Sequence, residues 1–135
     1  MGREILFKAK RKDNGGWVEG YLMPRPNSFG KPQYYIVPPS GALWYEIDPD
    51  TLCQYTGLTD KNGKKIWEND ICDRKEKYPE IVTYNEGDWQ LDYSYALGKE
   101  MHYAACNLGF YACERKCVEV IGNVFDNQEL LEVCR

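Results

Sequence analysis

The sequence predicts an all-β chain, and three observations support this prediction. Aromatic residues make up 14% of the 135 residues, with 11 Tyr and 4 Trp, and aromatic side chains suit the half-buried pleated surface of a sheet. Turn-forming Gly, Pro, Asn and Asp interrupt the chain about every eight to twelve residues. No stretch before the C-terminal end sustains the apolar period of a helix. Many short strands in series favour a barrel or a sandwich.

The first half of the chain contains four apolar or aromatic runs that we expect to be strands, at 3–9, 17–23, 33–37 and 43–47. Asp13-Asn14-Gly15-Gly16 predicts a tight turn, so the first two runs should form a hairpin. The Pro-rich segment 24–32 is expected to be a loop. Residues 48–51 predict a turn or a single helical turn.

The second half contains further expected strands, at 66–73, 81–84, 89–93, 101–106, 109–113 and 118–125. Asn85-Glu86-Gly87-Asp88 predicts a second hairpin. Asp60-Lys61-Asn62-Gly63 predicts a tight reversal, and we expect Gly57 and Gly63 to have positive φ. Gly122 permits a bulge in the last strand.

A short helix is expected at the C-terminal end, over 128–133, with Asp126 or Asn127 as its N-cap. No apolar run approaches the roughly 18 residues that span a bilayer. The N-terminal segment lacks the apolar core of a secretory signal. These features predict a chain that stays in the cytoplasm and does not contact a membrane.

Six cysteines raise the alternatives of free thiols and a zinc site: Cys53, Cys72, Cys106, Cys113, Cys117 and Cys134. Structural zinc sites favour pairs of ligands two to four residues apart, and only Cys113 and Cys117 have that spacing. In a reducing compartment free thiols are the default. We therefore expect neither a metal nor a cofactor.

Candidate catalytic groups are sparse. Glu68 and Asp70 are expected on one face of a strand, either as an acid–base pair or as structural carboxylates that accept backbone N–H bonds, and we favour the structural role. His102 is the only histidine, and Cys106 would lie about 13 Å away along a strand. A Gly-rich phosphate loop is missing from the sequence. The sequence therefore predicts no catalytic residues and no enzyme.

Two groups of residues are candidates for partner binding. Basic residues cluster near the N-terminus, at Arg3, Lys8, Lys10, Arg11 and Lys12. They form either a solvated strand end or an anion-binding patch. Tyr93 and Tyr95 alternate on one expected strand face, where exposed aromatic rings could stack on bases or bind a peptide. The six candidates are Arg3, Lys8, Lys10, Arg11, Tyr93 and Tyr95.

Three ordered motifs carry a resemblance to a known family. They are Arg3-x-Ile5-x-Phe7-Lys8-Ala9 with Trp17-Val18-x-Gly20, then QYTGLTDKNGKKIWENDI at 54–71, then VIGNVFDNQELL at 120–131. They resemble the opening, central and C-terminal signatures of the YopX family, whose members are encoded by phages and prophages. Asn69 stands where the family often has Gly, and Gln128 stands where Pro is common. We expect structural roles for Gln54, Tyr55, Thr56, Gly57, Asp60, Gly63, Glu68, Asp70, Gly122 and Asn123.

The resemblance implies a single domain over 1–135, with an N-terminal β-subdomain at about 1–65 joined to a C-terminal SH3-like barrel at about 66–135. It also implies expression in the cytoplasm of a bacterial host, and it implies no reaction, because the family has no known function. The leading hypothesis is a non-catalytic accessory protein that binds a host or phage protein. The alternatives are a nucleic-acid-binding barrel and, third, a small metal-dependent enzyme. Assembly into a homo-oligomer stays open.

Overall fold

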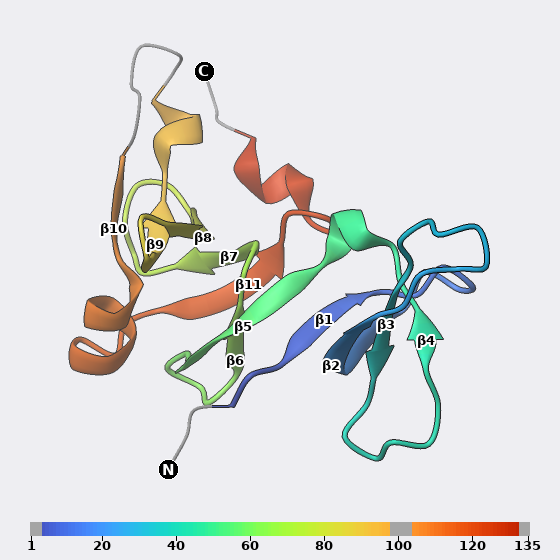
Figure 1. Ribbon diagram of the computed structural model, residues 1–135. Coiled ribbons are helices and arrows are strands. Elements are labelled where there is room, and N and C mark those ends of the chain that lie inside the picture. The colour runs from blue at the N-terminus through green and yellow to red at the C-terminus, as the bar shows by residue number, and fades with distance from the viewer. Residues whose placement is uncertain (1–3, 98–103, 133–135) are drawn as a thin grey trace. The chain divides into compact units, whose positions relative to one another are not determined.

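A computed structural model describes residues 4–97 and 104–132 (Figure 1). These residues form an all-β fold with two antiparallel sheets, in the strand orders β4-β3-β2-β1-β5-β6 and β10-β9-β8-β7-β11. The chain divides into two compact units, Met1–Tyr55 and Thr56–Arg135. No helix in the described part of the chain is long and apolar enough to cross a membrane.

The N-terminal unit holds strands β1 (Phe7–Lys10), β2 (Trp17–Pro24), β3 (Tyr34–Val37) and β4 (Tyr45–Glu46), and β5 (Cys53–Thr59) begins in it. β1 and β2 form the expected hairpin, and Gly15 takes a φ of 72° in its turn. The sheet curls, because Ile47, just after β4, pairs with Arg11, just after β1. Buried Ala9, Ile36 and Ile47 form the core of this unit.

A short 3₁₀ turn, Pro49–Thr51, follows β4 at the place where a turn or helical turn was expected. The Asp48 carboxylate accepts a hydrogen bond from the backbone N–H of Asp50 at 3.0 Å, which caps the turn. The Thr51 hydroxyl oxygen accepts a bond from the backbone N–H of Lys10 at 2.8 Å. These bonds fix the turn against β1.

The C-terminal unit holds the remaining strands: β6 (Lys65–Trp67), β7 (Asp70–Asp73), β8 (Glu80–Asn85), β9 (Asp88–Asp92), β10 (Ala105–Asn107) and β11 (Glu119–Asn123). β8 and β9 form the expected second hairpin. The core of the C-terminal unit consists of Ile66, Cys72, Val82, Leu91, Leu108, Ala112, Val118 and Val120. β10 and β11 are the edge strands of the five-stranded sheet (Figure 1). Within the described residues this sheet does not close into a barrel.

The prediction of a continuous strand over 66–73 is wrong. β6 ends at Trp67, Glu68 and Asn69 form a turn, and β7 begins at Asp70. Asn69 has a φ of 70°, a conformation that Gly and Asn adopt most readily. The chain passes from one sheet to the other at this turn. Glu68 and Asp70 therefore do not share a strand face.

The prediction of a strand over 109–113 is also wrong, because Phe110–Glu114 is a single π-helical turn. The Asn107 side-chain oxygen accepts a hydrogen bond from the backbone N–H of Phe110 at 2.7 Å, and Arg115 N–H donates to the Phe110 carbonyl at 3.0 Å. Asn is a residue type that often stands at the start of a helix, and the strand prediction for this segment did not take Asn107 into account. The strand expected over 101–106 appears only as β10, and residues 101–103, with His102, lie outside the described residues.

The last strand contains the bulge expected at Gly122, because the register of β11 against β7 shifts between Val120 and Gly122. A Cβ atom on Gly122 would lie 2.6 Å from the Asn127 side-chain oxygen. That oxygen accepts from the backbone N–H of Asn123 at 3.1 Å. Asn127 thus stands at the N-cap position of the final 3₁₀ turn, Gln128–Leu131, but its side chain holds the bulge and does not cap the turn.

Candidate functional site

The carboxylate of Asp60 anchors the central motif. One oxygen accepts from the backbone N–H groups of Asn62 and Lys64, each at 2.9 Å. The other accepts from Val120, in β11, also at 2.9 Å. Burial alone would raise the pKa of Asp60, but these three hydrogen bonds outweigh burial and lower it. Asp60 therefore ties the turn between β5 and β6 to the last strand.

Other residues of the central motif also take part in local structure. Asp70 is buried and accepts from the backbone N–H of Trp67 at 2.8 Å, across the turn that the chain makes between β6 and β7. The Thr56 hydroxyl donates to the Ile66 carbonyl at 2.7 Å. Gly57 and Gly63 have φ values of 85° and 82°, which confirms the expected positive φ. These contacts stabilise the fold and leave the motif without an open acid pair.

The described basic residues near the N-terminus make different contacts. Lys8 and Lys10 lie on one face of β1, with their ammonium groups 4.6 and 5.5 Å from the centre of the Trp17 ring. Arg11 instead forms two hydrogen bonds to Asp13, at 2.9 and 2.6 Å. Arg3 lies outside the described residues.

The same face of the N-terminal sheet continues onto β2 and β3 as an aromatic surface. The register places Met23 directly opposite Tyr35, and direct partners share a face. The Tyr35 ring packs edge-on against Trp44, with ring centres 5.9 Å apart. Tyr21, Met23 and Trp44 are 50%, 37% and 43% exposed. We call Tyr21, Met23, Tyr35 and Trp44 the outer face.

Charged residues of both signs border the outer face. The Arg25 guanidinium lies 5.6 Å from the centre of the Trp44 ring. Glu19 is exposed and stands opposite Lys8 in the register of β1 and β2. Glu46 stands opposite Tyr35, and its carboxylate accepts from Lys12 at 3.1 Å. The surface is therefore aromatic at its centre and of mixed charge around it.

A hydrogen-bonded loop between β2 and β3 presents a further aromatic ring. The side-chain oxygen of Asn27 accepts from the backbone N–H groups of Phe29 and Lys31, each at 2.9 Å. Phe29 is 88% exposed. Sequence reasoning missed this ring and the exposed residues of the outer face, because strand alternation shows which residues share a face but not whether that face is covered.

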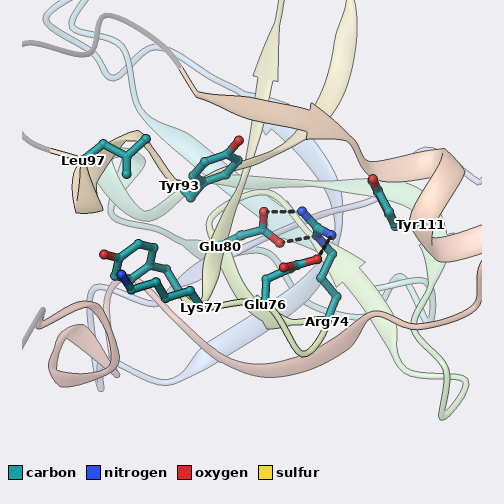
Figure 2. A pocket seen from close by; sticks show the side chains of 8 residues that line it. Arg74, Glu76, Lys77, Glu80, Tyr93, Leu97 and Tyr111 are labelled. Carbon is teal, nitrogen blue, oxygen red and sulfur yellow. Dashed lines mark hydrogen bonds and ion pairs between the residues drawn. The ribbon is translucent and has the colours of Figure 1, made fainter.

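The C-terminal unit contains a cavity of about 320 Å³ (Figure 2). It is lined by Arg74, Glu76, Lys77, Tyr78, Glu80, Tyr93, Leu97 and Tyr111. Of the two predicted tyrosines, only Tyr93 lines it. The Tyr95 hydroxyl donates to the Pro79 carbonyl at 2.7 Å. The expected strand alternation of Tyr93 and Tyr95 is wrong, because Ser94–Ala96 is a 3₁₀ turn.

A buried ion pair forms the floor of this cavity. Arg74 Nε lies 2.7 Å from one oxygen of Glu80, and Nη2 lies 3.2 Å from the other. Glu80 is 2% exposed. Burial raises the pKa of Glu80, and the hydrogen bonds and charge of Arg74 oppose that shift. Burial would lower the pKa of Arg74, but Glu80 outweighs it and raises the pKa, so the guanidinium stays charged.

The remaining contacts of Arg74 fix its orientation. Its Cζ lies 4.2 Å from the centre of the Tyr111 ring, and Nη2 lies 3.3 Å from the sulfur of Cys106. Nη1 lies 3.0 Å from a carboxylate oxygen of Glu76. Burial and the charge of Glu80 raise the pKa of the Cys106 thiol to about 11, so it is protonated at neutral pH. This arrangement suits binding and does not supply an activated nucleophile.

The described residues contain no group of three or more His, Cys, Asp or Glu side chains arranged to hold a metal ion. Cys113 and Cys117, the one close pair, lie at the π-helical turn and just after it, and Cys134 lies outside the described residues.

The model of the YopX protein family matches residues 7–132. Among solved structures, protein EF1440 from Enterococcus faecalis is similar, with a TM-score of 0.55 and 23% identity over 97% of this chain and 100% of that one. Protein yopX from Bacillus subtilis gives 0.54 and 18% identity, over 99% of this chain and 100% of that one. These likenesses show the fold. No curated protein matches the chain.

Proposed function

The chain belongs to the YopX family, and we propose that it is a non-catalytic accessory protein of a phage or prophage that binds a protein partner through the outer face. On this proposal it acts in the cytoplasm of a bacterial host. The SH3-like character of the C-terminal half is also part of the proposal, and the five antiparallel strands of that half support it.

The observation that carries the proposal is the exposure of Tyr21, Met23 and Trp44 on one side of a sheet whose other side packs on the core. Large aromatic side chains on a solvent-facing surface contribute little to folding, and contiguous ones mark interaction sites. Trp, Tyr and Arg are also the residues that most often dominate the energy of protein interfaces. Arg25 beside Trp44 fits that composition.

The charge around the outer face favours a protein over a nucleic acid. Residues 1–55 contain 7 Lys and Arg against 6 Asp and Glu, and residues 56–135 contain 10 against 15. Surfaces that bind phosphate backbones need a basic excess, since phosphate neutralisation supplies most of their affinity. Glu19, on the same sheet face, would repel phosphate. The partner we expect therefore has an apolar centre and charges of both signs at its rim.

The chemistry of the C-terminal unit supports a role without catalysis. The carboxylates of Asp60 and Asp70 already accept backbone hydrogen bonds. The Cys106 thiol is held protonated. None of these three groups is available as a general base or a nucleophile at neutral pH.

Affinity capture from a bacterial host lysate tests the proposal when it compares three forms of the chain. The Tyr21→Ser/Trp44→Ser double variant removes the centre of the outer face. Tyr84→Ser removes a ring that is more exposed than either of these and lies on β8. We expect a stoichiometric protein that resists nuclease, is lost with the double variant and is kept with Tyr84→Ser. Loss of all captured material on nuclease treatment would instead favour the nucleic-acid alternative.

A further inference from the structure

We propose that the cavity of the C-terminal unit (Figure 2) binds a carboxylate group carried by an aromatic or apolar ligand, and that Glu76 occupies the carboxylate position in the free protein. This inference does not depend on the outer face, because every residue that lines the cavity belongs to the C-terminal unit.

The cation of the site is held in place before any ligand arrives. Two atoms of the Arg74 guanidinium, Nε and Nη2, bond to Glu80, which is almost fully buried. The face of the guanidinium stacks on the Tyr111 ring. Arg74 therefore loses little freedom when a ligand binds, which favours affinity.

The third nitrogen of the guanidinium, Nη1, is paired with a side chain that a ligand could replace. Nη1 bonds to Glu76, and Figure 2 shows the Glu76 and Glu80 carboxylates both directed at the guanidinium of Arg74. The Glu76 side chain is 57% exposed, and an ion pair with so exposed a partner contributes little to stability. A ligand carboxylate can take the place of Glu76 and keep the charge-assisted hydrogen bond that guanidinium groups favour.

The charge of the lining matches a ligand with one negative charge. With Glu76 in place, the lining carries Arg74 and Lys77 against two carboxylates. When Glu76 turns to solvent, the lining keeps two cations, Arg74 and Lys77, against the one carboxylate of Glu80, which leaves one positive charge in excess. A monocarboxylate restores the neutrality of the lining.

The rest of the lining defines the body of the ligand. Tyr78, Tyr93 and Leu97 give it aromatic and apolar walls, and Figure 2 places Tyr93 and Leu97 across the cavity from Tyr111. A volume of about 320 Å³ is at the lower end of the range of small-molecule sites. That volume fits one aromatic amino-acid residue or a small aromatic acid.

The test is an NMR titration of the full ¹⁵N-labelled chain with N-acetyl-phenylalanine and with its C-terminal amide. The two probes differ only in the carboxylate. We expect the acid to shift the Arg74 Nε–H and Tyr111 backbone N–H signals and to bind about tenfold or more tightly than the amide, because only the acid forms the charge-assisted bond. Phenylacetate as a third probe distinguishes the source: tighter binding than N-acetyl-phenylalanine indicates a free small acid, and weaker binding indicates a polypeptide C-terminus.

Glu76→Ala gives the decisive comparison, because it removes the competing carboxylate at an exposed position. We expect it to tighten binding of the acid by about threefold or more, since an exposed ion pair no longer has to be broken. Glu132→Ala removes an exposed acid outside the cavity and should leave binding unchanged. Equal affinity for the acid and the amide, or equal effects of the two substitutions, would overturn the proposal.

Discussion

A single carboxylate, Asp60, holds the turn between β5 and β6 and the start of β11 through three backbone hydrogen bonds. In Asp60→Asn the amide has one accepting oxygen and no charge. Hydrogen bonds to charged groups contribute about 1.5–3 kcal/mol, so we expect the free energy of unfolding at neutral pH to fall by about 2 kcal/mol. Urea denaturation measures this, with exposed Asp50→Asn as the control. A loss no larger than the control's would contradict this role.

The pKa of Asp60 makes its contribution depend on pH. Because the folded-state pKa lies below the unfolded value of about 3.9, Asp60 stabilises the protein above that pH. The contribution is lost as the pH falls through the folded pKa. The difference in unfolding free energy between the natural chain and Asp60→Asn should therefore be constant near neutral pH and shrink below about pH 4. A difference that stays constant into acid would show that the charge of Asp60 is not the cause.

Gly57 and Gly63 act through the backbone alone. Both have positive φ, and a Cβ atom on either would meet no heavy atom within 4 Å. Gly57→Ala and Gly63→Ala should therefore each cost about 1 kcal/mol or more from the left-handed conformation. Thermal unfolding measures these losses of stability. Gly109 has a φ of −58°, so Gly109→Ala should leave the stability almost unchanged in the same experiment. Equal effects at all three positions would mean that backbone conformation does not decide them.

At the scale of elements, the ion pair of Arg74 and Glu80 joins the connection that follows β7 to the first residue of β8. Glu80→Gln leaves the guanidinium without its buried counter-charge, and breaking a buried pair costs about 3–5 kcal/mol. Glu76→Gln alters an exposed partner and should cost less than about 1 kcal/mol. Denaturation of both variants with guanidinium chloride compares their free energies of unfolding directly. A similar small loss in both would show that burial does not strengthen the Glu80 pair.

The elements that sequence reasoning predicted well are those defined by local turn chemistry. Asp13-Asn14-Gly15-Gly16 and the turn within Asn85–Asp88 need positive φ, and both join hairpins. The prediction of one continuous strand over 66–73 was wrong, because apolar and polar residues alternate in the same way whether a strand continues or the chain changes sheet. Only Asn69, tolerant of positive φ, marked the break.

The candidate sites depend on contacts between distant segments, which local patterns do not encode. The sequence showed Lys8 and Lys10 within a basic cluster, but the aromatic rings on the same sheet face come from other strands. The pairing of Arg74 with Glu80 and Tyr111 joins the end of β7 to β8 and to the π-helical turn. Nothing in the spacing of these three residues predicted that they would meet.

For the whole molecule, the charge is divided unevenly: residues 1–55 are close to neutral, and residues 56–135 carry most of the negative charge. A nucleic-acid interface would give affinity that falls steeply with salt. The mixed charge around the outer face predicts only a shallow salt dependence for its complex, since apolar burial would supply most of the affinity. A steep salt dependence of partner binding would argue for phosphate contacts.

The most direct test of the outer face is the affinity of the captured protein, measured by calorimetry for the natural chain, for Tyr21→Ser/Trp44→Ser and for Tyr84→Ser. Hot-spot truncations commonly cost about 2 kcal/mol or more, so the double variant should weaken binding by more than about tenfold. Tyr84→Ser should bind like the natural chain, because Tyr84 lies on β8 and is not one of the residues that form the outer face. Unchanged affinity in a folded double variant would contradict the account and place the binding surface elsewhere.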